Sequence, residues 1–259
     1  GVTFTLGGGT ITTLDVGDGG VIVNDGTFAF ANDTLNHVSG VPDQVLRIGA
    51  NASVSLEGSG DMLMSGGESG IDGAGSASST LSQASTHSVS VPGVIQQITF
   101  DNAGTVTADN GTLTLSSALL QGTGALNITD DGVVMLSGSA ISGNTLTGLA
   151  GGRLDADTSA ANQLSGVTLE GALTLGGSNS SFITLTGINT NNAALTFAND
   201  TLNHISGVPD QALRVVGGTA TTLAGTGSLA MTSSETGIDG DGAGVSQLTN
   251  AASHTLLGR

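Results

Sequence analysis

Apolar residues alternate with small polar residues in short segments along the whole chain. From Leu113 to Leu195 such segments recur every 19 to 22 residues, each beginning at a small residue: 111–115, 132–136, 152–154, 171–175 and 193–197. Alternation with period two is typical of a short strand with one buried face, and Gly, Asn, Asp and Ser between the segments favour turns. The pattern therefore predicts strands and turns throughout, with almost no helix.

Two further strand candidates, 118–120 and 124–128, lie between Leu113 and Val134, so about three short strands fit into a coil of about 20 residues. A coil of this size cannot enclose a core, but stacked coils bury their inward residues on one another. We therefore predict an all-β fold, a right-handed parallel β-helix (β-solenoid). At about 4.8 Å per coil, about 12 coils would form a rod about 55 to 60 Å long. The residues predicted to point inward are Leu113, Leu115, Leu126, Ile128, Val134, Leu136, Leu154, Leu173, Leu175, Leu195 and Phe197.

A long internal repeat overlies this short rhythm. Residues 30–48 (FANDTLNHVSGVPDQVLRI) recur as 197–215 (FANDTLNHISGVPDQALRV), an offset of 167 residues with 16 of 19 positions identical. The register continues without a gap to His87 in the first copy and His254 in the second. Because insertions shift the phase of a coil, the ungapped register predicts that the two copies share one backbone path, including the loops 32–42 and 199–209.

The repeat sets the expected domain organisation. We expect residues 1–259 to form one continuous solenoid, with a first unit of about 1–167 and a partial second unit of about 168–259. A second copy that stops partway leads us to expect a fragment of a longer array, or a subunit whose ends meet identical neighbours.

The composition fits a thin aliphatic core. Trp, Tyr, Cys and Lys are absent and aromatic residues make up 2% of the chain, so Leu, Val, Ile and Ala must fill the interior. The 43 glycines follow no three-residue period and accompany only 3 prolines, which excludes collagen. Charged residues are 10% against 37% hydrophobic residues, so the chain lacks the profile of a disordered tail.

The net charge of −17 limits the classes of molecule that we expect to bind the chain. A polyanion with four dispersed arginines repels phosphate backbones, so nucleic acid and anionic membranes are not expected partners. No apolar run is long enough for a transmembrane helix, which argues against membrane insertion. The chain starts Gly1-Val2-Thr3, as a processed segment would, and the absence of Cys leaves the compartment open.

Several phrases resemble a known class of sequence. Residues 102–106 (NAGTV), 111–115 (GTLTL), 122–126 (GTGAL) and 248–256 (LTNAASHTL) are similar to the degenerate repeats of large bacterial surface adhesins. The similar families are autotransporter passenger domains and filamentous-haemagglutinin-like exoproteins, and the resemblance covers most of the chain. It implies a right-handed β-helix at the bacterial cell surface or outside the cell, with a structural or adhesive role. Expected partners are identical subunits or further repeats stacked end to end, and host or surface glycans.

One polar set occurs in both copies. It comprises Asp33, His37, Asp43 and Arg47, with twins at Asp200, His204, Asp210 and Arg214. A His between carboxylates could act as a general base, and Asp with Arg could hold a sugar. The favoured interpretation is a loop fixed by Asp caps and an Asp–Arg pair, because a catalytic centre needs one preorganised cleft and this set appears twice.

Carbohydrate-active β-helix enzymes, either polysaccharide lyases or glycosidases, are the alternative function. They need paired carboxylates or metal-bound acids in one groove, with aromatic or basic residues for the sugar. The closest carboxylate pair, Asp130-Asp131, precedes Gly132 and predicts a turn. We therefore predict no enzyme activity and no catalytic residue. A third reading, an ice-binding face built on Thr-x-Thr fragments such as 105–107, would need regular Thr ranks that the sequence does not assemble.

Some acidic and histidine residues have side chains that could bind a metal ion. Asp239 and Asp241 alternate with glycine and are the calcium candidates. An acidic turn is favoured, because the first copy (72–75, DGAG) lacks the second carboxylate and no EF-hand loop is present. A zinc site at His87 or His254 would want a second His or Cys nearby, so these are predicted to be corner or ladder residues. No cofactor is expected. The sequence thus predicts the non-enzymatic shaft of an adhesin or surface filament.

Overall fold

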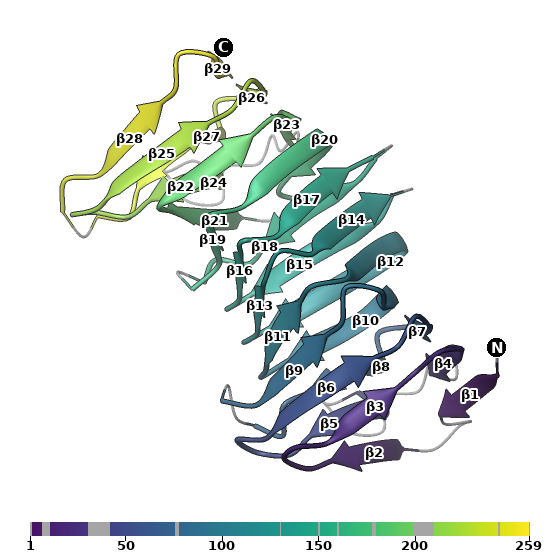
Figure 1. The fold of residues 1–259 in the computed structure, drawn as a ribbon. Coiled ribbons are helices and arrows are strands. Elements are labelled where there is room, and N and C mark those ends of the chain that lie inside the picture. Colours follow the sequence, from purple (N-terminus) through teal and green to yellow (C-terminus); the bar gives the residue numbers. More distant parts are fainter. Residues whose placement is uncertain are drawn as a thin grey trace.

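The chain forms a β-solenoid of about 10 turns with about 23 residues per coil. Of the residues that the structure describes, 62% lie in strands and none in a helix. The computed structural model describes residues 2–6, 11–30, 42–75, 78–129, 131–149, 151–159, 161–177, 180–198, 210–242 and 244–258. Strands of successive coils pair in parallel, and the first and last coils lie at opposite ends of the stack (Figure 1). The predicted parallel β-helix is confirmed.

Each coil contributes strands to three faces, named here faces 1, 2 and 3. Face 1 contains β1 (Thr3–Leu6), β4 (Thr27–Phe30), β7 (Asp61–Leu63), the first parts of β10 (Ser88–Gln96) and β12 (Thr105–Ser116), β14 (Ala125–Thr129), β17 (Thr145–Gly148), the first part of β20 (Thr168–Leu175), β22 (Ile188–Asn191), β25 (Ala220–Ala224) and β28 (Gln247–Asn250). Face 2 contains β2 (Thr12–Val16), β5 (Gln44–Ile48), β8 (Ser69–Asp72), the second parts of β10 and β12, β15 (Val133–Ser137), β18 (Arg153–Ala156), the second part of β20, β23 (Ala194–Phe197), β26 (Ser228–Ala230) and β29 (Thr255–Leu257).

Face 3 contains β3 (Val21–Val23), β6 (Ser53–Glu57), β9 (Thr80–Gln83), β11 (Thr99–Asn102), β13 (Leu119–Gln121), β16 (Ala140–Ser142), β19 (Gln163–Ser165), β21 (Ser181–Thr186), β24 (Gln211–Val215) and β27 (Thr236–Gly240). Because β10, β12 and β20 run around a corner without a break, faces 1 and 2 form one 19-stranded sheet among the described residues, while face 3 is a separate 10-stranded sheet.

The core is a continuous column of stacked aliphatic side chains. All eleven residues predicted to point inward are buried, none more than 3% exposed, which confirms the predicted strand phase. Within the column like sits on like: Leu126 of β14 pairs with Val106 of the preceding coil and with Leu146 of the following one. Burying each such side chain stabilises the fold by about 1.5–3 kcal/mol, and every coil depends on both neighbours for that burial.

The coils are longer on average than the spacing of the middle segments indicated. Thr105 pairs with Ala125 in the next coil, whereas Thr12 near the N-terminus pairs with Gln44. Longer connections between strands enlarge the coils at both ends, so the chain completes about 10 turns where we expected about 12. At about 4.8 Å per coil the stack is about 48 Å long.

The two repeat copies keep one pairing register. The pairing of β5 with β8 recurs between β24 and β27, and that of β6 with β9 recurs between β25 and β28, every residue being displaced by 167 positions. The repeated sequences QVLRI and QALRV form β5 and β24. The predicted match of the loops 32–42 and 199–209 falls almost entirely outside the described residues.

Twin strands nevertheless lie on different faces of the solenoid. The 10-stranded sheet contains β6 and β9, but their twins β25 and β28 belong to the 19-stranded sheet. Conversely, β5 and β8 lie in the 19-stranded sheet and their twins β24 and β27 in the 10-stranded one. A unit of 167 residues at about 23 residues per coil spans about seven and a third coils, so the second copy is turned by about a third of a revolution about the solenoid axis.

We predict that Leu173→Asp destabilises the fold by several kcal/mol, because it buries a carboxylate without a partner at a position that is 3% exposed. The matched control is Thr174→Asp, which places the same carboxylate on the outward phase of the same strand beside Arg153. Thermal unfolding followed by circular dichroism compares the two. Equal melting temperatures for the two variants would show that the strand phase is wrong.

Candidate functional site

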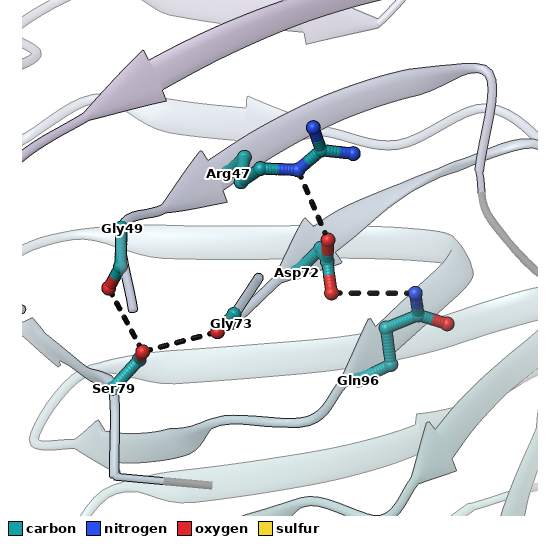
Figure 2. A network of polar contacts seen from close by, with 6 residues as sticks. All are labelled: Arg47, Gly49, Asp72, Gly73, Ser79 and Gln96. Carbon is teal, nitrogen blue, oxygen red and sulfur yellow. Dashed lines mark hydrogen bonds and ion pairs between the residues drawn. The ribbon is translucent and has the colours of Figure 1, made fainter. Parts of the chain in front are cut away.

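Part of the predicted polar set belongs to a ladder on face 2. Arg47 donates from Nε to Oδ2 of Asp72 at 3.2 Å, and Gln96 donates from Nε2 to Oδ1 of the same carboxylate at 3.3 Å (Figure 2). The three residues stand on consecutive rungs of β5, β8 and β10. The Asp72 side chain is only 6% exposed, so this nearly buried charge is held by two donors. The arrangement joins three coils.

The twin of this pair lies on face 3. Arg214 of β24 stands 3.8 Å from Asp239 of β27, whose side chain is 35% exposed. The Arg214 guanidinium also lies 3.6 Å from the ring centroid of Phe182, on the preceding rung. This is cation–π geometry, and partial burial strengthens the interaction. Arg214 thus bridges the coils on either side of it.

The remaining members of the set divide into two groups. Asp43 and Asp210 are 1% and 0% exposed and stand directly before β5 and β24. Their backbone carbonyls accept hydrogen bonds from the N–H groups of Thr12 at 2.7 Å and Ser181 at 2.8 Å, which begins each strand pairing. The others lie outside the described residues: Asp33, His37, Asp200 and His204.

Ser79 ties together two coils close to the Arg47 ladder (Figure 2). Its hydroxyl lies 2.9 Å from the carbonyl oxygen of Gly49 and 3.0 Å from that of Gly73, and it accepts a hydrogen bond from the backbone N–H of Asn51 at 3.1 Å. Ser79 is fully buried. A buried hydroxyl with three backbone neighbours has a structural role and is not an exposed nucleophile.

The corner that follows face 3 holds a device that sequence analysis did not foresee. Asn24 donates from Nδ2 to the carbonyl oxygen of Asp61 at 3.0 Å and reaches Nε2 of His87, two coils away, at 3.0 Å. The intervening coil presents Gly60, where a Cβ atom would lie 2.7 Å from the Asn24 carbonyl oxygen. Glycine therefore lets the intervening coil pass close to the backbone of Asn24 and Gly26 at the point where the bridge forms.

The same bridge occurs in the second copy. Asn191 donates from Nδ2 to the Ser228 carbonyl oxygen at 3.2 Å and reaches Nε2 of His254 at 2.8 Å, past Gly227. The other ring nitrogen of His254, Nδ1, lies 2.6 Å from Oδ1 of Asn250. An amide N–H can donate only to an unprotonated Nε2, so this geometry requires the neutral imidazole with its proton on Nδ1. His87 and His254 are thus corner residues, as predicted.

A third bridge uses two asparagines. Asn102 donates from Nδ2 to the Ala125 carbonyl oxygen at 3.1 Å and to Oδ1 of Asn144 at 2.9 Å. Here Gly124 is the intervening residue, and a Cβ atom on it would lie 2.7 Å from the amide carbon of Asn102. The recurring pattern is Asn, then Gly one coil later, then Asn or His two coils later. The repeated Asn24/Asn191 positions were the sequence signal for it.

The remaining carboxylates of interest also serve turns. Asp131, the described member of the predicted pair 130–131, has φ of 62° at the turn before Gly132, as expected for a turn. Burial raises the pKa of Asp157, but hydrogen bonds from the Ser137 hydroxyl, the Ser159 N–H and the Asn162 amide outweigh burial and hold this pKa below its usual value. Such a carboxylate acts as a turn cap.

The calcium candidates Asp239 and Asp241 are separated by one glycine in the chain and have different partners. Asp239 faces Arg214 across the coils, and Oδ1 of Asp241 accepts a hydrogen bond from the backbone N–H of Gly217 at 2.8 Å. In the part of the chain that the structure describes, no three His, Cys, Asp or Glu side chains converge in a way that could hold a metal ion.

The outward Thr residues form only short ranks. Thr105 on face 1 is flanked by Ser88 in the preceding coil and Ala125 in the following one. Thr145 and Thr168 do stack directly on neighbouring coils. This mixture of Thr, Ser and Ala is a polar exterior of small side chains.

We predict that Gly124→Ala destabilises the fold by about 1–3 kcal/mol, the usual range for overpacking, because its methyl group would collide with the Gly104 carbonyl oxygen and with the Asn102 amide that bridges to Asn144. The matched control is Gly67→Ala, an exposed site where a Cβ atom meets nothing within 4 Å. Urea unfolding measures both. A loss at Gly67 as large as that at Gly124 would contradict the proposed role of the intervening glycine.

The histidine bridges predict a pH dependence. Burial lowers the pKa of both His87 and His254 below 6.5, partly offset at His87 by Asp61. Above pH 6.5 both rings are neutral in the folded and unfolded chain; below it the unfolded chain takes up protons first, so stability falls as the pH drops from 6.5 towards the lowered folded-state pKa. Urea midpoints from about pH 7.5 to about pH 5.5 should therefore fall.

The control for this pH dependence is the double variant His87→Gln/His254→Gln, whose amides carry no titrating proton. Its urea midpoint should vary less over the same interval than that of the unmodified chain. An unchanged slope would assign the pH dependence to other groups.

Comparisons with known proteins do not link this fold to a family. No family model, no curated protein and no solved structure matches the chain. The described residues include no helix that could span a bilayer.

Proposed function

We propose that this chain is a non-enzymatic structural β-solenoid, the shaft of a bacterial adhesin or surface filament outside the cell. The observation that carries the proposal is the single apolar core, which runs without interruption from Leu6 in the first coil to Leu229 near the last. Coils that share one core and one set of parallel hydrogen bonds act as a stiff spacer.

The use of polar side chains supports this proposal. Asp72, His87 and Asn102 are each buried and each bond to a residue of another coil. A glycosidase would direct two carboxyl groups at one bond, about 5–10 Å apart in a shared groove. Asp72 instead faces Arg47 and Gln96. The buried polar groups therefore connect coils, which is what a shaft requires.

Charge and sequence resemblance support the location and partners of the proposal. The net charge of −17 keeps neighbouring rods apart by mutual repulsion. The Gly/Thr/Leu phrases resemble adhesin repeats, and this resemblance supports a location at the cell surface, with host or surface glycans and further solenoid coils as candidate partners. The carbohydrate-active β-helix enzyme is the competing function.

A distance measurement tests the shaft. The chain has no Cys, so the double variant Gly17→Cys/Ala252→Cys, at exposed sites in the first and last coils, accepts two spin labels. Dipolar electron resonance should give a narrow distribution centred near 50 Å, from about 10 turns at about 4.8 Å each. A broad or much shorter distribution would contradict a rigid rod.

Incubation with a panel of polysaccharides addresses the competing function. We expect no new reducing ends and no unsaturated uronates, with the polysaccharide chain length unchanged. Depolymerisation of any member of the panel would overturn the non-enzymatic assignment and favour the β-helix enzyme.

A further inference from the structure

The last coil of the chain exposes an apolar sheet edge. Among the residues that the structure describes, strands β27, β28 and β29 pair on one side only, with β24, β25 and β26. Leu256 and Leu257 of β29 are 37% and 51% exposed, and Val245 is 86% exposed. Open parallel strands with apolar side chains are a template for further strand pairing. We name the surface formed by β27, β28 and β29 the C-terminal face.

The first repeat copy shows what covers the equivalent face. The twins of β27, β28 and β29 are β8, β9 and the start of β10, and each pairs on its second side with a strand of the next coil: β10, β11 and β12. Leu81 and Val89 are 0% exposed beneath that coil. Their twins on the C-terminal face are Leu248, which is half-buried, and Leu256, which is 37% exposed.

A polar contact distinguishes the covered face from the open one. Asp72 lies between Arg47 of the preceding coil and Gln96 of the following coil, and its side chain is 6% exposed (Figure 2). Its twin Asp239 has the equivalent arginine, Arg214, but no equivalent of Gln96 among the described residues, and its side chain is 35% exposed. The open face thus keeps a carboxylate in the position where an amide from the next coil binds.

A backbone contact in the first copy also depends on the coil that covers it. A Cβ atom on Gly70 would collide with the carbonyl oxygen of Val94 in the covering coil, so the close approach of that coil demands glycine. The twin position on the C-terminal face is also glycine, Gly237. The C-terminal face therefore combines the glycine, the carboxylate and the apolar residues that meet a coil in the first copy.

We propose that the C-terminal face binds one further solenoid coil with the sequence pattern of residues 93–108. In that coil Ile95, Phe100 and Val106 cover Ile71, Leu81 and Val89. Equivalent residues would cover Ile238, Leu248 and Leu256, and an amide equivalent to Gln96 would bind Asp239. The inference rests on the proposed filament role and goes beyond it by naming the part of the repeat that the face selects.

The N-terminal coil of a second copy fits this face less well. If the three faces continued across such a junction, β27 would meet β3, which reads Val21-Ile22-Val23 and has no side-chain donor for Asp239. In a second copy, residues 93–108 are themselves paired on both sides. The matching coil must therefore come from an unpaired segment of the same repeat type.

The test extends the full chain by two coils, the first of which carries the pattern of residues 93–108. Arg259 is the twin of Pro92, so a second copy of residues 93–129 placed after Arg259 continues the register. The matched control has the same extension with Ile95→Asp, Phe100→Asp and Val106→Asp in the added copy only. Hydrogen exchange read by mass spectrometry over residues 247–257 should be at least about tenfold slower in the first chain than in the control.

Two results would overturn the inference. One is equal exchange in the two extended chains, which would show that the face does not recognise the pattern. The other is slow exchange in the unextended chain that depends on concentration and also protects β1 to β3, which would identify a second copy as the occupant. Neither result depends on enzymatic activity. Failure of this inference can therefore be told apart from failure of the filament role, which would be shown by depolymerisation of a polysaccharide.

Discussion

Each coil of this solenoid acquires a buried interior only through its neighbours. In a coil of about 23 residues most strands present one or two inward side chains, and these leave water only when the next coil lies about 4.8 Å away. Backbone pairing and apolar stacking therefore impose the same spacing on every rung. With aromatic residues at 2% of the chain, close stacking of Leu, Val and Ile has to do what a few large rings do in most domains.

That fixed spacing explains where the glycines and asparagines stand. Two coil steps are about 9.6 Å apart, so in each bridge the Asn side chain and the His or Asn side chain two coils away cover the distance together. Gly60, Gly124 and Gly227 stand on the intervening coils next to Asn24, Asn102 and Asn191, and at each of them an added Cβ atom would collide with the preceding coil. The corner bridges thus satisfy buried polar groups and also register alternate coils, so slippage by one residue would break them.

Much of the fold could be predicted because its strands alternate strictly. Period two placed β13 and β14 correctly and put Leu113 and Leu195 in the core, since only one face of each strand is buried. The average coil length was harder to predict from the sequence. The regular repeat in the middle of the chain indicates a short coil, whereas longer connections near both ends enlarge the coils there. Arg47 and Asp72 were not paired in advance, since a contact between coils depends on how many residues separate the rungs. The Asn bridges were overlooked although Asn24 and His87 each recur at the repeat offset.

The mismatch between repeat and coil has a geometric consequence for any array of such units. Because each unit ends about a third of a revolution beyond its start, three units in succession would bring a given strand back to its original side. A residue present once per unit, such as Arg47 and its twin Arg214, would trace a screw thread around the shaft instead of a stripe along one edge. A partner approaching such a rod from any direction would then meet the same side chains at regular axial intervals, and binding would not depend on how the rod is turned about its own length.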